Sequence, residues 1–317
     1  MRARLQRWFE SRLPLSDSVT LTQRNVYILP TRPGLVLAAT LLLLLVASIN
    51  YQLNLGYLLT FLLAGSTLVG MHVSHGTLRG LTLHLTPPRP AFAGAQALLD
   101  VVLSNDRPRP RYSVGLCVQG GPGQPQWVWA DVPAAGSATL QLGFVPVARG
   151  RHRVPTLSAE TRFPLGTFRV WTVWRPAAHV LVYPAPEAHP PPLPPGQALA
   201  GKAASAPASH AAEPDGVRPY RRGDALQQVA WKKSAQTGTL ISREASTQQA
   251  QELWLDLAHA GLGQREAQLS RLCAWVLMAD RLGLSYGLRL PGLNIGPASG
   301  EAHRLKCLEA LALCGNA

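Results

Sequence analysis

The side chains best suited to bind a partner or to act in chemistry gather between Glu213 and Glu244. Arginines surround a tyrosine there, a Gly-Asp pair follows, and a tryptophan lies further along. Gly and Asp favour a turn, because glycine tolerates positive φ and aspartate bonds its own backbone. Arg, Tyr and Trp are the types that dominate binding hot spots. The residues are Arg218, Tyr220, Arg221, Arg222, Gly223, Asp224 and Trp231.

Two interpretations of this 213–244 segment stay open. In the first, some arginines project towards an acidic partner and Tyr220 or Trp231 is the apolar anchor. In the second, the segment is a structural clasp: Asp224 caps a turn or helix, Trp231 packs beside a sheet, and an arginine pairs with Asp224 or Glu244.

Catalysis is not indicated. The carboxylates of the C-terminal half are each explained as turn, salt-bridge or strand-end residues; they are Asp215, Asp224, Glu244 and Asp256. The histidines lack metalloprotease spacing, and no Gly-rich phosphate loop precedes a helix. Cys117 could pair with His152 or His179, but the alternation around Cys117 places it in a sheet core. We therefore predict a chain that is not an enzyme and that has no catalytic or cofactor-binding residues.

The composition limits the partners. The chain has 317 residues, enough for about two soluble domains, and its formal net charge is +13. Nucleic acid, anionic lipid or an acidic protein could balance that charge. No recognition helix or base-stacking motif is evident, so nucleic acid is not expected. The cysteines show no CxxC spacing and are predicted to be free, buried thiols; they are Cys117, Cys273, Cys307 and Cys314.

Two uncharged runs, Leu35–Ile49 and Leu53–Val73, predict two transmembrane helices at about 33–50 and 53–73. A span needs about 20 apolar residues. The alternatives are a signal peptide or a buried core hairpin, but the leader before Leu35 is too long for a signal peptide. Basic residues flank the outer ends of the pair, and its turn is uncharged. By the positive-inside rule, both termini and the soluble domains are expected to be cytoplasmic.

The remaining chain divides into segments of different texture. Residues 1–32 are a basic N-terminus, and the membrane segment covers 33–75. Residues 80–185 contain short alternating runs separated by turn signals, which predict a β-sandwich of the Ig-like kind. In that module Trp127, Trp129, Trp171 and Trp174 are expected to serve packing, with an aromatic binding face as the alternative. Its arginines, in loops around 107–111 and 149–153, are expected to form a solvated surface that contacts anionic lipid headgroups next to the helical hairpin.

Residues 186–212 are rich in Pro, Ala and Gly and predict a flexible or polyproline-type linker. Residues 213–317 follow with the 213–244 segment and a C-terminal domain. In that domain, strands at Glu252–Leu257 and Ser285–Leu290 alternate with helices at Gln264–Leu282 and Glu301–Leu313. Strand–helix–strand–helix order predicts a parallel βαβ unit.

The 213–244 segment resembles the motif of the bacterial "domain of unknown function 58" family. Pro214 stands where an aromatic residue is usual, and Ala230 stands where an Asp usually precedes the Trp. Weaker likeness extends over most of the chain, including Arg149-Gly150 and Pro164–Phe168. The matching residues are Glu213, Gly216, Arg218, Tyr220, Gly223, Asp224, Trp231, Ala235, Leu240, Arg243 and Glu244.

The resemblance implies a partial von Willebrand A-like C-terminal domain, in which Asp-x-Ser-x-Ser forms a metal site. Here the run is Asp256-Leu257-Ala258-His259-Ala260, so both serines are missing and the site is degenerate. Without hydroxyl ligands, Asp256 is poorly equipped to hold Mg²⁺. We therefore expect no metal.

The resemblance also implies a multi-pass protein of the bacterial inner membrane. Its function would be that of a scaffold or adaptor for a MoxR-type AAA+ ATPase, in protein assembly or maturation. The alternative is a cell-envelope enzyme, or an accessory subunit of a transglutaminase-like membrane protein.

Overall fold

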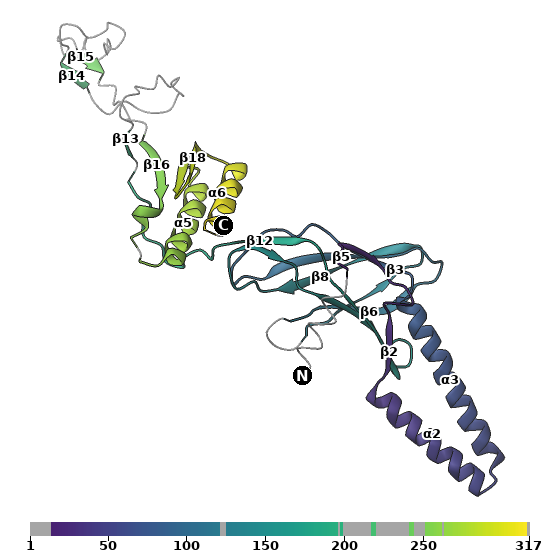
Figure 1. Cartoon of the computed structure of the whole chain (residues 1–317). Helices are drawn as coiled ribbons and strands as arrows, with labels where there is room; N and C mark the ends of the chain where they lie inside the picture. The colour runs from purple at the N-terminus through teal and green to yellow at the C-terminus, as the bar shows by residue number, and fades with distance from the viewer. Residues whose placement is uncertain are drawn as a thin grey trace. The chain divides into compact units, whose positions relative to one another are not determined.

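The computed structural model describes residues 14–120, 125–195, 197–198, 217–219, 241–243, 251–261 and 263–315. The chain forms two compact units, which are described separately (Figure 1). The first contains Met1–Ala188 with Gln264–Cys273 and Leu308–Ala317, and the second contains His189–Gly263 and Ala274–Cys307.

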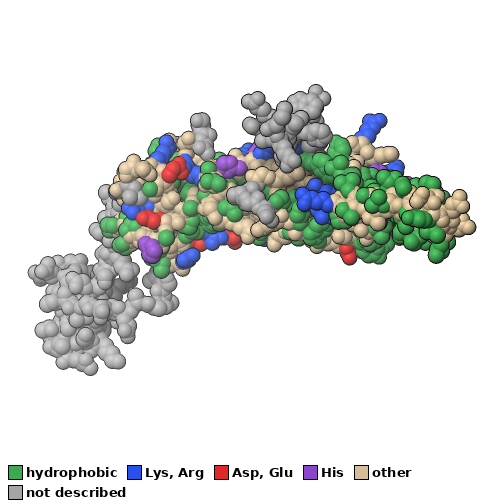
Figure 2. All heavy atoms as spheres, turned by 90° about the horizontal axis from the view of Figure 1, so that it is seen from below, with side chains coloured by type: hydrophobic (Ala, Val, Ile, Leu, Met, Phe, Trp, Pro, Cys, Tyr) green, Lys and Arg blue, Asp and Glu red, His purple; other side chains and the backbone are tan. Residues whose placement is uncertain are grey.

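Two long helices form an antiparallel hairpin, α2 (Arg32–Asn50) and α3 (Asn54–Leu78). Their mean hydropathies are 2.1 and 1.4, and both are long and apolar enough to cross a membrane. Only 11% of each apolar window is buried within the structure. Leu43 is 71% exposed and Leu55 is 77% exposed. Figure 2 shows the hairpin as a largely hydrophobic surface, which is typical of a membrane or interaction surface.

Two antiparallel sheets form the body of the first unit. The first sheet has the order β1 (Ser18–Thr20), β3 (Leu81–Leu85), β5 (Ala97–Asn105) and β8 (Gly136–Phe144). The second has the order β2 (Tyr27–Pro30), β11 (Phe168–Trp174), β10 (Leu157–Thr161), β6 (Arg111–Val118) and β7 (Val128–Val132). A small third sheet joins β4 (Ala91–Phe92), β12 (His179–Tyr183) and β9 (Gly150–Arg153). We call these strands the sheet module.

The two large sheets share one hydrophobic core. Alternate residues of β3 and β5 point inward, as the period of a half-buried strand requires. Leu83 and Leu103 pair across those strands and are buried. Leu116 of β6 and Leu157 of β10 close the core from the second sheet. Burying each such side chain contributes about 1.5–3 kcal/mol. The sheet-rich content expected for residues 80–185 is therefore present.

The module also takes strands from the segment 1–32, which the sequence analysis assigned to a basic N-terminus. β1 pairs with β3, and β2 pairs with β11, so each large sheet has an N-terminal edge strand. These strands have only three and four residues and are partly exposed, so they are too short for an alternating pattern to reveal them. The helical hairpin is thus inserted within the sheet module, between β2 and β3.

The start of α2 is fixed to the turn between β10 and β11. Thr31 caps the helix, because its hydroxyl accepts from the amide of Gly34. The same hydroxyl donates to the Gly166 carbonyl at 2.6 Å, and the Thr31 amide donates to the Thr167 carbonyl. A Cβ on Gly34 would lie 2.1 Å from the Thr167 oxygen, so only glycine permits this approach.

The end of α3 is fixed by Arg111 and Ser74. Arg111 is buried and donates to the carbonyls of Gly76 and Arg79, and to Asn105 Oδ1 at 3.3 Å. A cation suits a helix C-terminus, where the last carbonyls lack partners and the dipole is negative. Ser74 Oγ donates to the Phe163 carbonyl at 2.5 Å. Arg111 therefore caps a helix instead of belonging to the expected solvated surface.

The second sheet system lies in the C-terminal part of the chain. Its order is β13 (Gln197–Ala198), β16 (Gln251–Asp256), β17 (Tyr286–Leu290) and β18 (Leu293–Ala298). β16 and β17 are parallel, and the chain between them passes through the 3-10 turn η2 (Leu257–Ala260) and helix α5 (Arg265–Arg281). This is the predicted βαβ order. β18 was not predicted; it pairs antiparallel with β17 before α6 (Glu301–Leu313).

The first residues of the predicted linker contact α5. Glu187 forms an ion pair with Arg271 at 2.8 Å, and its amide donates to the Ser270 carbonyl. Further on, Trp275 Nε1 donates to the Pro191 carbonyl at 2.9 Å. Residues Glu187 and Pro191, at the start of the predicted flexible or polyproline-type linker, are therefore bonded to α5.

The contact at Gly34 gives a direct test of the fixed hairpin. Gly34→Ala should lower the free energy of unfolding by about 1–3 kcal/mol, because the methyl group overpacks against the Thr167 carbonyl. Gly65→Ala is the matched control, since no atom lies within 4 Å of its Cβ position. Thermal unfolding of both variants in the same detergent measures the difference. Equal melting temperatures would contradict the close approach.

Candidate functional site

The structure places only the two ends of the 213–244 segment. β14 (Val217–Pro219) pairs antiparallel with β15 (Ile241–Arg243), and Arg218 lies opposite Ser242. The backbones of Arg218 and Arg243 are thereby brought into one two-stranded ribbon. The other predicted residues lie outside the described part of the chain: Glu213, Gly216, Tyr220, Arg221, Arg222, Gly223, Asp224, Trp231 and Glu244.

Asp256 ends β16 and caps the following turn. Its carboxylate accepts from the amide of Ala258 at 3.0 Å, which is the ordinary use of an Asp at a helix start. Within the described residues, no group of three or more His, Cys, Asp or Glu side chains could hold a metal ion. The expectation of a degenerate site stays a prediction, because part of the C-terminal domain lies outside the described residues.

The thiols are placed for packing. Cys117, Cys273 and Cys307 are buried and free. Burial raises the pKa of Cys117 to about 11 and that of Cys273 to about 12. Cys117 lies opposite Ser158 in the second sheet, whereas His152 and His179 belong to the third sheet, where His152 bonds the Arg149 carbonyl. The structure therefore does not bring Cys117 together with either histidine in one sheet.

The outer face of the second sheet carries an aromatic surface. Tyr27 and Trp171 are cross-strand neighbours with ring centroids 5.2 Å apart. Trp127 and Trp129 form a second pair at 5.8 Å. We call these four residues the aromatic face. The fourth predicted tryptophan, Trp174, points the other way; it is buried in the core and donates to the Ser16 carbonyl.

Glycine allows one of these rings to lie against the sheet. Gly115 pairs with Trp129 across β6 and β7, and a Cβ on Gly115 would lie 2.7 Å from the Trp129 ring. The ring therefore lies over the backbone, with 44% of Trp129 exposed. Aromatic side chains presented in this way offer contact area with little conformational entropy to lose.

A buried carboxylate lies between the two aromatic pairs. Glu160 on β10 is opposite Gly115 on one side and Trp171 on the other, and it is 1% exposed. Arg169 Nε lies 2.5 Å from Glu160 Oε2, and Arg162 Nη2 lies 3.2 Å from Oε1. The two ion pairs offset part of the cost of burying the charge, which is high when it is unpaired, while Oε1 has no hydrogen-bond partner among the described residues.

The arginines that pair with Glu160 also reach the surface. The Arg169 guanidinium lies 5.8 Å from the Trp171 ring centroid, within cation–π range. The indole nitrogen of Trp171 is buried and has no hydrogen-bond partner among the described residues. The face thus offers the exposed ring of Trp129, three half-buried rings and the guanidinium donors. These groups can bind a polar or acidic segment, and they supply no nucleophile–base pair for catalysis.

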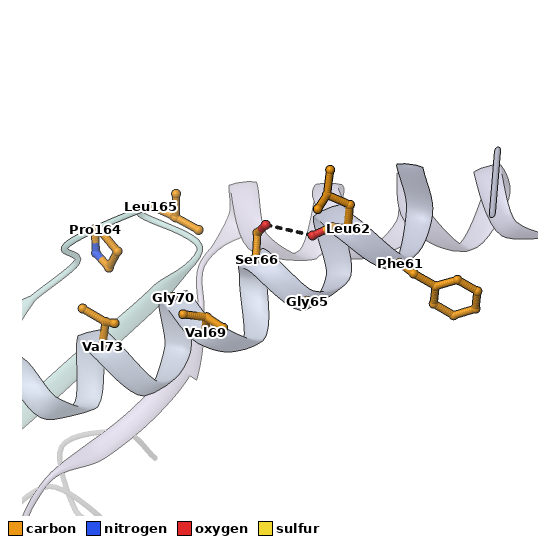
Figure 3. A pocket seen from close by; sticks show the side chains of 9 residues that line it. All are labelled: Phe61, Leu62, Gly65, Ser66, Val69, Gly70, Val73, Pro164 and Leu165. Carbon is orange, nitrogen blue, oxygen red and sulfur yellow. Dashed lines mark hydrogen bonds between the residues drawn. The ribbon is translucent and has the colours of Figure 1, made fainter. Parts of the chain in front are cut away.

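A second concave feature lies on the hairpin. A groove of about 480 Å³ runs along α3, lined by its residues between Phe61 and Val73 and closed by Pro164 and Leu165 (Figure 3). Its lining is almost wholly apolar, and Ser66 bonds the Leu62 carbonyl of its own helix. Leu165 packs onto Gly70, where a Cβ would meet the leucine at 2.8 Å. The groove suits an apolar chain.

Glu160 and Tyr27 were not predicted as site residues because β10 and β2 were not recognised as strands. Arg169 lies in a predicted strand, Phe168–Val173, but its partner Glu160 was not foreseen. A signal was present: in Leu-Ser-Ala-Glu-Thr, apolar and polar residues alternate before a Pro-Leu-Gly turn. The following strand alternates Arg169 and Trp171 with Val170 and Thr172. Pairing these two patterns across the turn would have placed Glu160 beside Trp171.

No protein-family model matches the chain, and no curated protein matches it either.

Cysteine burial predicts selective alkylation. In the folded protein, N-ethylmaleimide should modify Cys314, which is half-buried, and should spare the other three cysteines. A raised pKa leaves less thiolate, which is the reactive form, and burial blocks access. Mass spectrometry after brief treatment at neutral pH, with denatured protein as the control, checks this. Rapid native modification of Cys273 would contradict its placement.

Proposed function

We propose that the chain is a non-catalytic, membrane-anchored scaffold or adaptor that works with a MoxR-type AAA+ ATPase in protein assembly or maturation. One observation carries the anchoring part: a hairpin that is apolar enough for a membrane is bonded at both of its ends into a sheet module. A flexible tether would only keep the sheet module near the bilayer, whereas these bonds fix the orientation of the module relative to the hairpin. A fixed orientation suits a scaffold that presents a surface to a partner.

The hairpin is proposed to make the chain a multi-pass protein of the inner membrane, with both termini and the soluble domains in the cytoplasm. The charges favour this topology. Arginines lie just before the start of α2 and just after the end of α3, whereas the turn at residues 51–53 is uncharged. Free cysteines are consistent with a reducing compartment. The sheet module is proposed to be an Ig-like sandwich, and the C-terminal domain a partial von Willebrand A-like fold.

The partner is proposed from the family resemblance of the 213–244 segment. Within that segment β14 and β15 pair antiparallel, and the sequence between these strands includes Arg221, Arg222 and Trp231. The aromatic face offers a second surface for a client or partner. Together they favour binding over catalysis, and no metal or cofactor is part of the proposal.

Charge reversal separates a binding segment from a structural clasp. Arg221→Glu with Arg222→Glu should leave the melting temperature nearly unchanged and abolish co-purification of the ATPase, because like-charge contact costs several kcal/mol. The matched control is Arg151→Glu with Arg153→Glu, two exposed residues of β9. Affinity purification in detergent with identification of the bound chains gives the readout.

Each result of that purification has a distinct meaning. If the Arg221 and Arg222 variant unfolds, the segment is a clasp. If it folds and still binds, the ATPase docks elsewhere. Capture of a transglutaminase-like membrane protein in place of an ATPase would favour the accessory-subunit function.

The topology has its own test. In a background without the native cysteines, Asn50→Cys should react with an impermeant thiol reagent in intact cells, because the turn faces outward. Ala134→Cys, in an exposed turn of the sheet module, should react only after lysis. Labelling of Ala134→Cys in intact cells would overturn the cytoplasmic assignment.

A further inference from the structure

Exposed arginines surround the base of the helical hairpin. Arg32 begins α2, Arg79 follows α3, and Arg162 lies in the turn that is bonded to both helices. Three more lie in the strand connections that meet the α3–β3 junction. We call the set the arginine collar: Arg24, Arg32, Arg79, Arg107, Arg109 and Arg162. Figure 2 shows Lys and Arg side chains beside the base of the hydrophobic hairpin.

The helix lengths place this collar at the headgroup layer of a bilayer. With 19 and 25 residues, α2 and α3 are about 28 and 37 Å long, and the hydrocarbon core is about 30 Å thick. The helices are aligned at their turn, where a Cβ on Gly56 would meet Ser48. The extra length of α3 therefore extends beyond the core on the side of the sheet module. Arg79 then lies among the headgroups.

The positive charge of the collar is only partly balanced by protein carboxylates. Arg162 pairs with Glu160 at 3.2 Å, and Glu160 is already shared with Arg169. Asp106 is the sequence neighbour of Arg107, and Asp131 accepts from the Ser113 amide. Beneath the collar, Arg111 bonds three neutral oxygens. Burial, and secondly the charge of Arg107, lower the pKa of Arg111. An anion at the collar would relieve that repulsion.

The groove on α3 extends from the collar into the hydrocarbon depth. Its upper wall is Pro164 and Leu165, which follow Arg162 in the same turn. Tyr112, 44% exposed, contacts Phe163 with ring centroids 5.2 Å apart, and tyrosine is enriched at membrane interfaces. A cationic rim above an apolar groove matches a molecule with an anionic head and an aliphatic chain.

We propose that the arginine collar binds the phosphate groups of anionic phospholipids, with one acyl chain in the α3 groove. Guanidinium groups bind phosphate through paired, charge-assisted hydrogen bonds, and they are weakly hydrated. The inference rests on the proposed membrane anchoring and adds a lipid preference to it. The lipid completes the base of the hairpin and holds the sheet module against the anionic leaflet.

The test measures which lipid the full-length protein retains. The protein is reconstituted into vesicles of phosphatidylcholine with a minor share of phosphatidylglycerol, and then extracted in mild detergent. Retained lipid should be enriched in phosphatidylglycerol about fivefold over the vesicles, which corresponds to about 1 kcal/mol, the contribution of one arginine near an anionic surface. High salt should remove the enrichment, because the screening length falls to about 3 Å at 1 M.

Matched variants locate the site. The collar variant replaces Arg79, Arg107 and Arg109 with Gln, and its enrichment should fall to the vesicle ratio. The control variant replaces Arg89, Arg151 and Arg153 with Gln; these exposed arginines lie towards the opposite end of the sheets, and enrichment should persist. Gly65→Leu, which fills the groove where nothing lies within 4 Å of the Cβ, should lower the amount of retained lipid.

The outcomes are separable. Wild-type protein that floats with vesicles yet retains lipid at the vesicle ratio overturns the lipid preference and leaves the anchoring intact. Protein that does not float with vesicles overturns the anchoring and the lipid site together. Enrichment that survives in the folded collar variant, or that ignores salt, also overturns the proposal. If the collar variant does not fold, the salt series on the wild type decides.

Discussion

The last carbonyl groups of an apolar helix need hydrogen-bond partners where the helix leaves the hydrocarbon, since unpaired backbone groups are costly there. In this chain a buried arginine of the sheet module provides them. Arg111 donates to carbonyls at the end of α3, while the Thr31 hydroxyl caps the start of α2. The sheet module and the hairpin are therefore joined by hydrogen bonds. Loss of these bonds would leave backbone groups at the helix ends without partners.

The turn between β10 and β11 joins two regions that sequence alone would keep apart. On one side Leu165 packs on α3, and the Phe163 carbonyl accepts from Ser74. On the other side the strands that enter and leave the turn carry Glu160 and Arg169, at the centre of the aromatic face. The aromatic face and α3 are thereby joined through one short connection, although they are distant in the chain.

The sequence predicted those elements whose signal is local. Leu81, Leu83 and Leu85 alternate within β3, and α6 was predicted with its observed bounds, Glu301–Leu313. The hairpin was found because its apolar runs are long. The elements that the sequence did not predict depend on contacts between residues distant in the chain. For example, β2 is a strand because it pairs with β11, and no local pattern in Tyr27–Pro30 indicates this pairing. Arg111 appeared as one of three loop arginines, since its capping role needs α3 to be placed first. The 213–244 segment was prominent in sequence, and the structure adds only the β14–β15 pairing there.

The insertion of the hairpin between β2 and β3 sets an order for biosynthesis. β2 leaves the ribosome early, but its neighbour β11 begins at Phe168, long after α2 and α3 have been made. At about 5–20 residues per second, the edge strand waits for roughly 7–30 seconds without its partner. Both apolar helices are therefore synthesised before the second sheet can close. The sheet module is completed around a hairpin that already exists.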